Sequence, residues 1–430
     1  MRNDRTNRNL WTHSASPAPE TAPLSGDATC QVAIVGGGFT GLSAALHLAE
    51  AGIDCILLEA MEIGFGGSGR NVGLVNAGMW MRPDDIVAAM GETVGGRLVE
   101  ELGDGPAQVF ALIEKHAIDC EAIRNGTLHL AVGEAGVKEV AIRAAQWRRR
   151  GAPVEALAAD RTAALTGARG FAGALLDRRA GTVQPLGYAH GLARAAIAAG
   201  ARVFTATPVL DGRSDGNSVI LRTANGEVRA GKLLLASNAY SGVAPSMPWS
   251  GHRDELVPMY YFQFATRPLP PDLASRILPE GHGCWDTGLV MTSFRTDKAG
   301  RLVFGSIGAL DTLGRTAHEA FARRSLRALF PFLGNVDFEY WWDGKIGMTA
   351  NNLPSFHRPE KNIWSIAGYN GRGISPGTVF GHALAQVTLG NDEAMMLPVT
   401  QPAPDALRAV KSAFYDLGAA AKHFIDRRLG

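Results

Sequence analysis

The stretch from Cys30 to Glu59 constrains the fold of this chain more than any other. Its first run, CQVAIV, is apolar and ends directly in glycines, as a buried parallel strand does. The segment FTGLSAALHLAEAG follows, with apolar residues on one helical face and Gly52 placed to end a helix. A second apolar run, DCILLEA, completes a strand–helix–strand unit of roughly 30 residues. This order predicts a parallel sheet with a crossover helix.

Three glycines at the first turn of this unit, Gly36, Gly38 and Gly41, have the spacing G-x-G-x-x-G. The first allows a tight turn, the second lets the backbone approach a pyrophosphate, and the third lets the helix lie close to the strand. Glu59 ends the second strand, where an acidic residue accepts hydrogen bonds from ribose hydroxyls. The unit therefore predicts dinucleotide binding; glycines that serve only a tight turn are the alternative.

A second match to the same spacing lies in GFGGSGRN, at Gly64, Gly66 and Gly69, but it lacks a buried strand before it and a helix after it. We interpret it as a glycine-rich loop just past the ribose-binding strand. Ser68, Arg70 and Asn71 in this loop are expected to follow the distal half of the dinucleotide towards its reactive ring. A flexible surface loop is the alternative interpretation.

The dinucleotide is expected to be FAD rather than NAD. The chain contains one fingerprint with the required strand and helix, so it has no second module for a pyridine nucleotide. The segment GYNGRGISPG (368–377) is a glycine loop that opens onto a helix. The N-terminus of that helix would stabilise the negative charge of a reduced flavin near its pyrimidine edge. An NAD-only dehydrogenase and a flavin-free binding protein that keeps the fold are the alternatives.

Charge and cysteine content exclude several classes of function. With 42 basic and 41 acidic residues, the chain offers no electrostatic case for binding nucleic acid or a membrane surface. Its four cysteines form no C-x-x-C pair and have no histidine at metal-ligand spacing, so we expect a reducing compartment and no metal. We find neither a signal-peptide h-region nor an apolar run of roughly 18 residues. These features predict a cytoplasmic protein without a transmembrane segment.

Several segments together resemble the D-amino-acid-oxidase-like FAD-dependent oxidoreductases: VAIVGGGFTGLSAALHLAEAG, LLEA, IGFGGSGRNVGLV, ASNAY and GYNGRG. Within that family the chain is most similar to the branch of γ-glutamylputrescine oxidoreductase and bacterial L-pipecolate oxidase. The resemblance implies non-covalent FAD, because the chain has no cysteine after Cys284 where sarcosine-oxidase relatives attach the flavin. It also implies a set of FAD-binding residues: Gly36, Gly38, Phe39, Thr40, Gly41, Glu59, Ala60, Gly67, Ser68, Arg70, Asn71, Val209, Ser237, Asn238, Gly371, Arg372, Gly373 and Ile374.

The expected fold class is α/β (α+β overall), a Rossmann-like FAD-binding domain interleaved with an antiparallel-sheet substrate domain. Long alternating strands from about residue 255 to 308 interrupt the α/β pattern, which returns at the C-terminal end. We assign 29–82, 155–245 and 340–430 to the FAD-binding domain, and 83–154 and 246–339 to the substrate domain. Residues 1–28, rich in Ser, Pro, Ala and Thr, are predicted to be a loosely ordered extension.

The resemblance implies oxidation of an amino-acid or amine C–N bond by hydride transfer to flavin, which gives an imine. Oxygen or another electron acceptor would reoxidise the flavin. Our specific expectation is a cyclic secondary amino acid such as L-pipecolate; a γ-glutamylputrescine-like polyamine or a D-amino acid is the alternative substrate. The sequence does not identify a catalytic acid or base.

Four residues are candidates for the substrate site. An α-amino acid requires a cation for its carboxylate, preferably a bidentate arginine. Arg372 is the first candidate and Arg295 the second. The alternative for Arg295 is that it is a solvated residue of a hairpin. Tyr260 and Tyr261 lie on a strand expected to form the floor of the pocket, and only one of two adjacent strand residues can face it. Packing of a buried tyrosine is the alternative role for these two residues.

Overall fold

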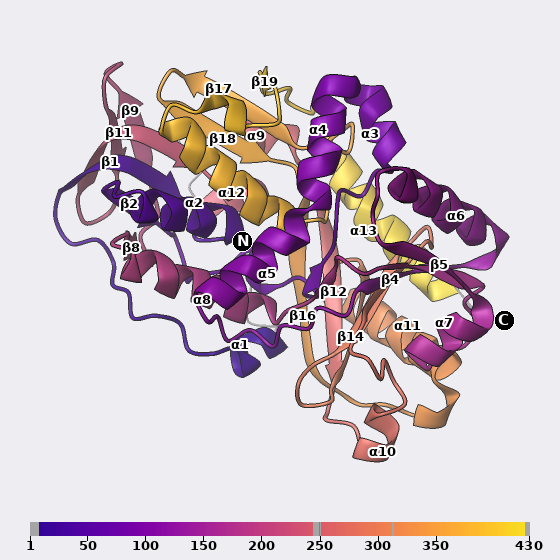
Figure 1. Cartoon of the computed structure of the whole chain (residues 1–430). Coiled ribbons are helices and arrows are strands. Elements are labelled where there is room, and N and C mark those ends of the chain that lie inside the picture. Colours follow the sequence, from indigo (N-terminus) through magenta and orange to yellow (C-terminus); the bar gives the residue numbers. More distant parts are fainter. Residues whose placement is uncertain (1–7, 244–248, 250, 312–313, 426–430) are drawn as a thin grey trace.

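The computed structural model describes residues 8–243, 249, 251–311 and 314–425. Residues 1–7 of the predicted extension and 426–430 of the predicted FAD-binding domain lie outside the described residues, as do 244–248, 250 and 312–313. In Figure 1 the described chain forms two large sheets, each covered by helices.

The first sheet has nine strands among the described residues and a parallel centre. β1 (Ala28–Val35) pairs in parallel with β2 (Cys55–Leu58) on one side and β11 (Glu227–Leu235) on the other. The remaining strands are β8 (Arg202–Phe204), β9 (Asp211–Ser214), β10 (Val219–Arg222), β17 (Ser355–Glu360), β18 (Ile363–Ala367) and β19 (Val399–Thr400). Strands β10 and β11 form the hairpin around Asn225-Gly226. This sheet confirms the predicted Rossmann-like unit.

Three helices pack together against this sheet, α2 (Phe39–Glu50), α8 (Pro185–Ala198) and α12 (Ile374–Thr388). Their apolar side chains share one buried cluster with the inner residues of β1 and β2. Helices α3 (Pro83–Met90), α4 (Glu92–Gly103) and α5 (Gly105–Lys115) continue this layer, and α5 contacts α12. None of the described helices combines the length and the apolar character that crossing a bilayer requires.

The second sheet has eight strands among the described residues and is largely antiparallel. Their order is β16 (Phe338–Met348), β12 (Val257–Thr266), β15 (Leu302–Ile307), β14 (Thr292–Thr296), β13 (Gly283–Asp286), β4 (Thr127–Ala131), β6 (Gly173–Asp177) and β5 (Val154–Ala158). Helices that contact this sheet are α6 (Gly133–Arg149), α7 (Ala159–Thr166), α11 (Gly314–Leu329) and α13 (Arg408–Ile425). Two short strands, β3 (Leu74–Val75) and β7 (Gly181–Thr182), pair separately.

The boundaries between the two parts differ from the predicted ones. We assigned 155–245 and 340–430 to the FAD-binding domain, but β5, β6 and β16 belong to the eight-stranded sheet, and α13 packs on β12. Conversely, α5 lies in the segment assigned to the substrate domain and packs on α12. The reason is strand pairing: β6 pairs with β4 and β5 pairs with β6, while β16 pairs with β12, so all three extend the eight-stranded sheet.

The segment from residue 8 to residue 27 is not a loose extension. Leu10 and Trp11 on α1 (Leu10–Ser14) are fully buried, against residues that include Trp342. The Trp11 indole N–H donates to the carbonyl of Asn71 at 2.8 Å, and the Asn9 amide donates to the carbonyl of Gly69 at 2.9 Å. The polar composition of this segment concealed two large apolar anchors, whose burial offsets the loss of chain entropy.

Candidate functional site

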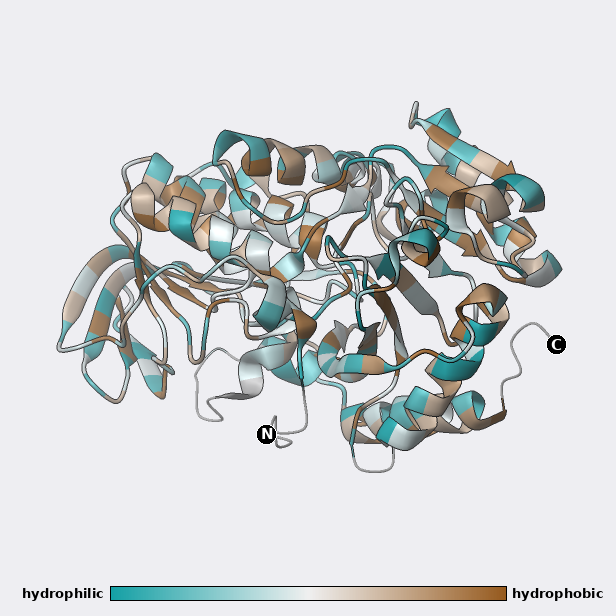
Figure 2. Cartoon of the chain, turned by 90° about the horizontal axis from the view of Figure 1, so that it is seen from below, coloured by the Kyte–Doolittle hydropathy of each residue, from teal (hydrophilic) through white to brown (hydrophobic). Residues whose placement is uncertain are grey.

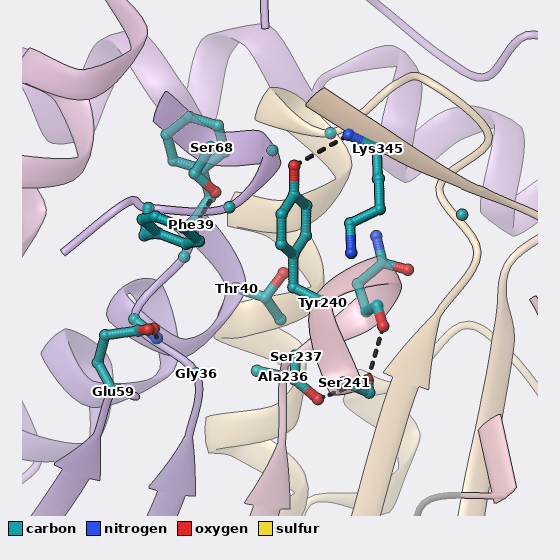
Figure 3. A pocket seen from close by; sticks show the side chains of 18 of the residues that line it. Gly36, Phe39, Thr40, Glu59, Ser68, Ala236, Ser237, Tyr240, Ser241 and Lys345 are labelled. Atoms are coloured by element: carbon teal, nitrogen blue, oxygen red, sulfur yellow. Dashed lines mark hydrogen bonds between the residues drawn. The ribbon is translucent and has the colours of Figure 1, made fainter. Parts of the chain in front are cut away.

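A large cavity lies where three parallel strands of the nine-stranded sheet end. The residues that follow β1, β2 and β11 line it, as expected for a ligand site at the carboxyl edge of such a sheet. It encloses about 1240 Å³ including its mouth. In Figure 3, Gly36 and Glu59 lie on one side and Tyr240 and Lys345 on the other. Fourteen of the predicted FAD-binding residues line it: Gly36, Gly38, Phe39, Thr40, Glu59, Ala60, Gly67, Ser68, Asn71, Val209, Ser237, Asn238, Gly371 and Gly373.

The N-terminus of α2 opens into this cavity. Its N-cap residue is Gly38, which supplies no side-chain cap to the helix. The first backbone N–H groups of the helix and its positive dipole end therefore lie beside the cavity. Backbone N–H groups at a helix N-terminus bind a pyrophosphate without any charged side chain.

The glycines of the first motif are required by close approach of the backbone. A Cβ atom on Gly41 would lie 2.0 Å from the carbonyl oxygen of Gly36. Gly36 has φ +114°, and its Cβ would lie 2.8 Å from the carbonyl oxygen of Ala236. Gly41 itself does not line the cavity, so its role is to let α2 pack close to the turn.

Glu59, the residue expected to bind the ribose, is held in place by backbone donors. Its carboxylate accepts from the backbone N–H of Gly37 at 2.6 Å and of Met61 at 2.9 Å. Burial raises the pKa of Glu59, and the backbone donors oppose that shift. These two hydrogen bonds hold the side chain at the end of β2, where its remaining lone pairs can accept hydrogen bonds from hydroxyl groups.

The second glycine motif docks onto the first. The N–H of Gly64 donates to the carbonyl of Gly37 at 2.9 Å, and the N–H of Phe39 donates to the Ser68 hydroxyl oxygen at 3.0 Å. Gly67 and Asn71 continue along the cavity wall. The loop is therefore ordered against α2 and is not a free surface loop.

Arg70 differs from its expected place in the cofactor site. Its Nε donates to the carbonyl of Phe65 at 2.8 Å and one Nη to the carbonyl of Asp343 at 3.2 Å. It is not among the residues that line the cavity. Its guanidinium joins the glycine loop to β16 instead, so it positions the loop that carries Ser68 and Asn71.

A second helix N-terminus reaches the cavity from the C-terminal part of the chain. Gly373, the N-cap of α12, lines the cavity and has no side-chain cap, while Ile374 is buried inside the helix. Thr40 and Tyr369 share a 2.7 Å hydrogen bond that ties α2 to the loop preceding α12. Two helix dipoles thus place partial positive charge along one ligand site.

Sequence reasoning missed the part of the wall that β16 contributes, and it missed Tyr240 although it named the neighbouring Ser237 and Asn238. Lys345, Ile346 and Gly347 from the eight-stranded sheet line the cavity, as does Tyr240. The Tyr240 hydroxyl accepts from the N–H of Lys345 at 2.9 Å, and the Lys345 ammonium lies 4.6 Å from the Tyr240 ring centroid (Figure 3). Burial, with Arg70 nearby, lowers the pKa of Lys345. The only signal was that β16 carries a lysine between two glycines.

Arg372 lies between the two glycines of the cofactor cavity but lines a different one. This second cavity, of about 300 Å³ including its opening, is also lined by His129, Arg143, Asp177 and Trp285 of the eight-stranded sheet and α6. The guanidinium lies 4.4 Å from the Trp285 ring centroid. Within the described part of the chain it has no hydrogen bond or ion pair. Burial, reinforced by Arg143, lowers its pKa to about 9.

His129 faces the same small cavity. Its ring stacks on Trp285 at a centroid distance of 3.4 Å, and its Nδ1 is buried with no hydrogen-bond partner among the described residues. Burial lowers the pKa of His129 well below its ordinary value, and both arginines add to the shift. The imidazole is therefore neutral at physiological pH and has a free polar atom.

The other predicted substrate residues are placed elsewhere. Arg295 is buried rather than solvated, and its guanidinium donates to the carbonyls of Gly73, Val183 and Thr296. The Tyr261 hydroxyl bonds to the hydroxyl of Ser293 at 2.8 Å. Arg295, Tyr260 and Tyr261 line neither of the two cavities. Arg295 is committed to backbone carbonyls, so it is not available as a carboxylate clamp.

The larger cavity fits FAD by its chemistry. It offers two helix N-termini with glycine at the N-cap for the pyrophosphate and the flavin, and an acidic side chain for a ribose. Gly36 closes its base, where a Cβ would collide with Ala236. No cysteine or histidine is among the described residues that line it.

Comparison with known proteins agrees with this site. The sequence profile of the DAO family, FAD dependent oxidoreductase, matches residues 31–387. The chain is 32% identical over 425 residues to gamma-glutamylputrescine oxidoreductase of Escherichia coli (strain K12), which covers 96% of this chain and 97% of that protein. It is 30% identical over 409 residues to probable oxidoreductase OrdL of Haemophilus influenzae, which covers 94% of each chain.

Solved structures show the same fold at lower sequence identity. Glycine oxidase from Geobacillus kaustophilus superimposes with a TM-score of 0.70 at 22% identity, over 84% of this chain and 95% of that chain. L-proline dehydrogenase from P. horikoshii superimposes with a TM-score of 0.68 at 17% identity, over 91% of this chain and 97% of that chain.

Proposed function

From the premise that this chain belongs to the DAO family of FAD-dependent oxidoreductases, and so oxidises an amine or amino acid, we propose that its substrate is a compact amino acid that Arg372 holds by the carboxylate. A cyclic secondary amino acid such as L-pipecolate is the specific candidate. The observation that carries this proposal is the buried, unpaired guanidinium beside the cofactor cavity. An unpaired buried charge is costly, and a carboxylate ligand relieves that cost.

The size and chemistry of the small cavity favour a compact substrate. It is much smaller than the cofactor cavity, with about 300 Å³ of space against about 1240 Å³, openings included. Arg372 would bind the carboxylate bidentately, and the unpartnered Nδ1 of neutral His129 would accept a hydrogen bond from the substrate nitrogen. Trp285 would close the apolar wall.

The bound flavin supplies the two-electron acceptor for oxidation of the C–N bond. The contribution of this chain is to orient the substrate, to exclude water and to keep the amine neutral, because a protonated amine has no lone pair to assist the oxidation. His129 would orient the nitrogen by accepting its hydrogen bond, while the positive charges of Arg143 and Arg372 in the same cavity would disfavour a protonated amine.

A γ-glutamylated polyamine is the second candidate substrate. The 32% identity to gamma-glutamylputrescine oxidoreductase over 96% of this chain supports it. Such a substrate also has a carboxylate for Arg372, but it is longer than the small cavity and would have to extend beyond it.

Anaerobic titration of the flavin-loaded enzyme distinguishes the two candidates. The visible absorbance of the flavin is recorded against L-pipecolate, L-proline, D-amino acids and γ-glutamylputrescine. We expect L-pipecolate to bleach it at the lowest concentration. If γ-glutamylputrescine bleaches the flavin while L-pipecolate and L-proline leave it yellow, the compact-substrate proposal is wrong and the second candidate is supported.

A further inference from the structure

The C-terminal helix α13 has its apolar side turned outwards. Its inward side consists of Ser412, Tyr415, Asp416, Ala419 and His423, which are buried or half-buried against the eight-stranded sheet and α11. Its outward side, together with Leu407 just before the helix, has six large apolar residues that are 58% to 82% exposed: Leu407, Val410, Phe414, Leu417, Phe424 and Ile425. A helix on a monomer surface normally shows the opposite arrangement.

The outward residues form a regular seam. Leu407, Val410, Phe414, Leu417, exposed Ala421 and Phe424 follow one another at alternating spacings of three and four residues. This is the repeat with which one helix packs along another helix. Ala413 and Gly418 flank the seam, and because alanine has only a methyl group and glycine no side chain, a second helix axis can approach closely.

We propose that this face, formed by residues 407–425, is the interface of a homodimer in which two copies of α13 pack antiparallel around a two-fold axis. A two-fold interface requires a patch that is complementary to itself. With the axis between Phe414 and Leu417, Phe414 meets Leu417 of the second copy, Val410 meets Ala421, and Leu407 meets Phe424. Each contact then joins a larger residue to a smaller one.

A parallel pair would pack less evenly. It would place Phe414 against Phe414 of the second chain, where the two rings would be crowded. It would place Ala421 against Ala421 of the second chain, where a void would remain. The antiparallel arrangement also places the two helix dipoles in their favourable orientation.

The exposed area matches the needs of a stable dimer. The six outward side chains expose on the order of 800 Å² per chain. This is about the area that each partner contributes to a standard protein–protein interface. An apolar patch of this size exceeds the few hundred Å² usual on a monomer. The helix is held firmly by the body that presents it, because Arg408 bonds to Asp254 at 3.2 Å and Arg324 donates to the carbonyl of His423.

A lipid surface fits this face less well than a second copy. A helix that lies on a membrane needs a strongly basic polar face beside its apolar one. Among the described residues of α13, only Lys411 and Lys422 are exposed cations, and the face opposite the seam is covered by protein.

The oligomeric state of the flavin-loaded full chain tests this proposal. Sedimentation or light scattering at micromolar concentration should give about 91 kDa, twice the 45.5 kDa of one chain. Leu417→Asp should give 45.5 kDa with unchanged FAD content and turnover. Ile142→Asp, a matched control on the exposed side of α6, should remain dimeric. A wild-type monomer, or a dimer that Leu417→Asp leaves intact, would overturn the proposal.

Cysteine pairing tests the antiparallel register. When Val410→Cys and Ala421→Cys proteins are mixed under mild oxidation, we expect a disulfide-linked dimer that needs both variants, with wild type as the background control. Efficient linking of each variant to itself would overturn the antiparallel arrangement. Binding of the wild type to vesicles of phosphatidylcholine and phosphatidylglycerol, as a monomer, would instead assign the face to lipid.

Discussion

Gly41 shows how a single residue limits cofactor binding without touching the cofactor. A Cβ atom at this position would collide with the Gly36 carbonyl, so Gly41→Ala must push α2 away from the pyrophosphate turn. We expect the purified variant to have lost most of its FAD, as measured by the ratio of flavin to protein absorbance. Gly96→Ala on α4, where a Cβ meets nothing within 4 Å, is the matched control and should retain its FAD.

Arg372 is the residue on which the substrate proposal rests. Replacing it with methionine removes a charge-assisted hydrogen-bond pair worth about 1.5–3 kcal/mol, so KM for a carboxylate substrate should rise about 10- to 100-fold. The kinetic comparison uses the same amine with and without its carboxylate. KM should rise only for the amine that carries the carboxylate. An equal rise in KM for both amines would contradict the proposal that Arg372 binds the carboxylate.

The residues around the larger cavity also predict how FAD is held. No cysteine or histidine is among the described residues that line it, so the flavin has no such side chain as a point of covalent attachment. Denaturation in acid followed by centrifugation should release all of the flavin into the supernatant. Yellow colour that stays with the precipitated protein would show a covalent bond.

At the scale of elements, α11 and α13 are joined through a buried histidine pair. Nδ1 of His318 lies 2.9 Å from Nδ1 of His423, and the Ser306 hydroxyl lies 3.2 Å from the other His423 ring nitrogen. Burial lowers the pKa of His318 from 6.5 to about 4, against a smaller opposing effect of Asp311. The native state therefore favours the neutral ring more than the unfolded chain does.

Acid should weaken this junction within a defined pH range. The unfolded chain binds the extra proton near pH 6.5 and the native protein only near pH 4, so the free energy of unfolding falls as the pH drops between these values, by up to about 3 kcal/mol. Urea titrations at pH 7 and pH 4.5 measure it. His318→Gln keeps a hydrogen-bonding group and should lose part of this pH dependence; an unchanged dependence would exclude His318 as its source.

At the scale of the whole molecule, the cofactor cavity joins the two sheets. Most of its wall comes from the nine-stranded sheet and its helices, while Lys345, Ile346 and Gly347 come from the eight-stranded one. A ligand that contacts both stabilises the folded chain as a unit, by about 2.7 kcal/mol at a hundredfold excess over its Kd. FAD added to the apoprotein should raise the unfolding temperature, measured by calorimetry. NAD, which lacks the flavin, should raise it far less.

Local sequence determined the features whose partners are close along the chain. The strand–glycine–helix unit and the hairpin at Asn225-Gly226 depend on residues close along the chain, and both are present. Glu59 lies at the end of β2, beside the cavity, as expected. The second glycine match was correctly separated from the first because it lacked a strand and a helix. The DAO family was recognised from the two glycine motifs, the strand that ends at Glu59, and the short segments ASNAY and GYNGRG.

Tertiary structure alone decided which sheet each strand joined and which side chains share a cavity. β5, β6 and β16 joined the eight-stranded sheet because its edges were available in space, although their positions in sequence favoured the other sheet. Arg372 and Arg295 are the same residue type, yet one faces a cavity unpaired and the other is bound by backbone carbonyls. The periodicity of apolar residues predicts which face of a helix or strand is buried, but it does not predict which other elements pack against that face.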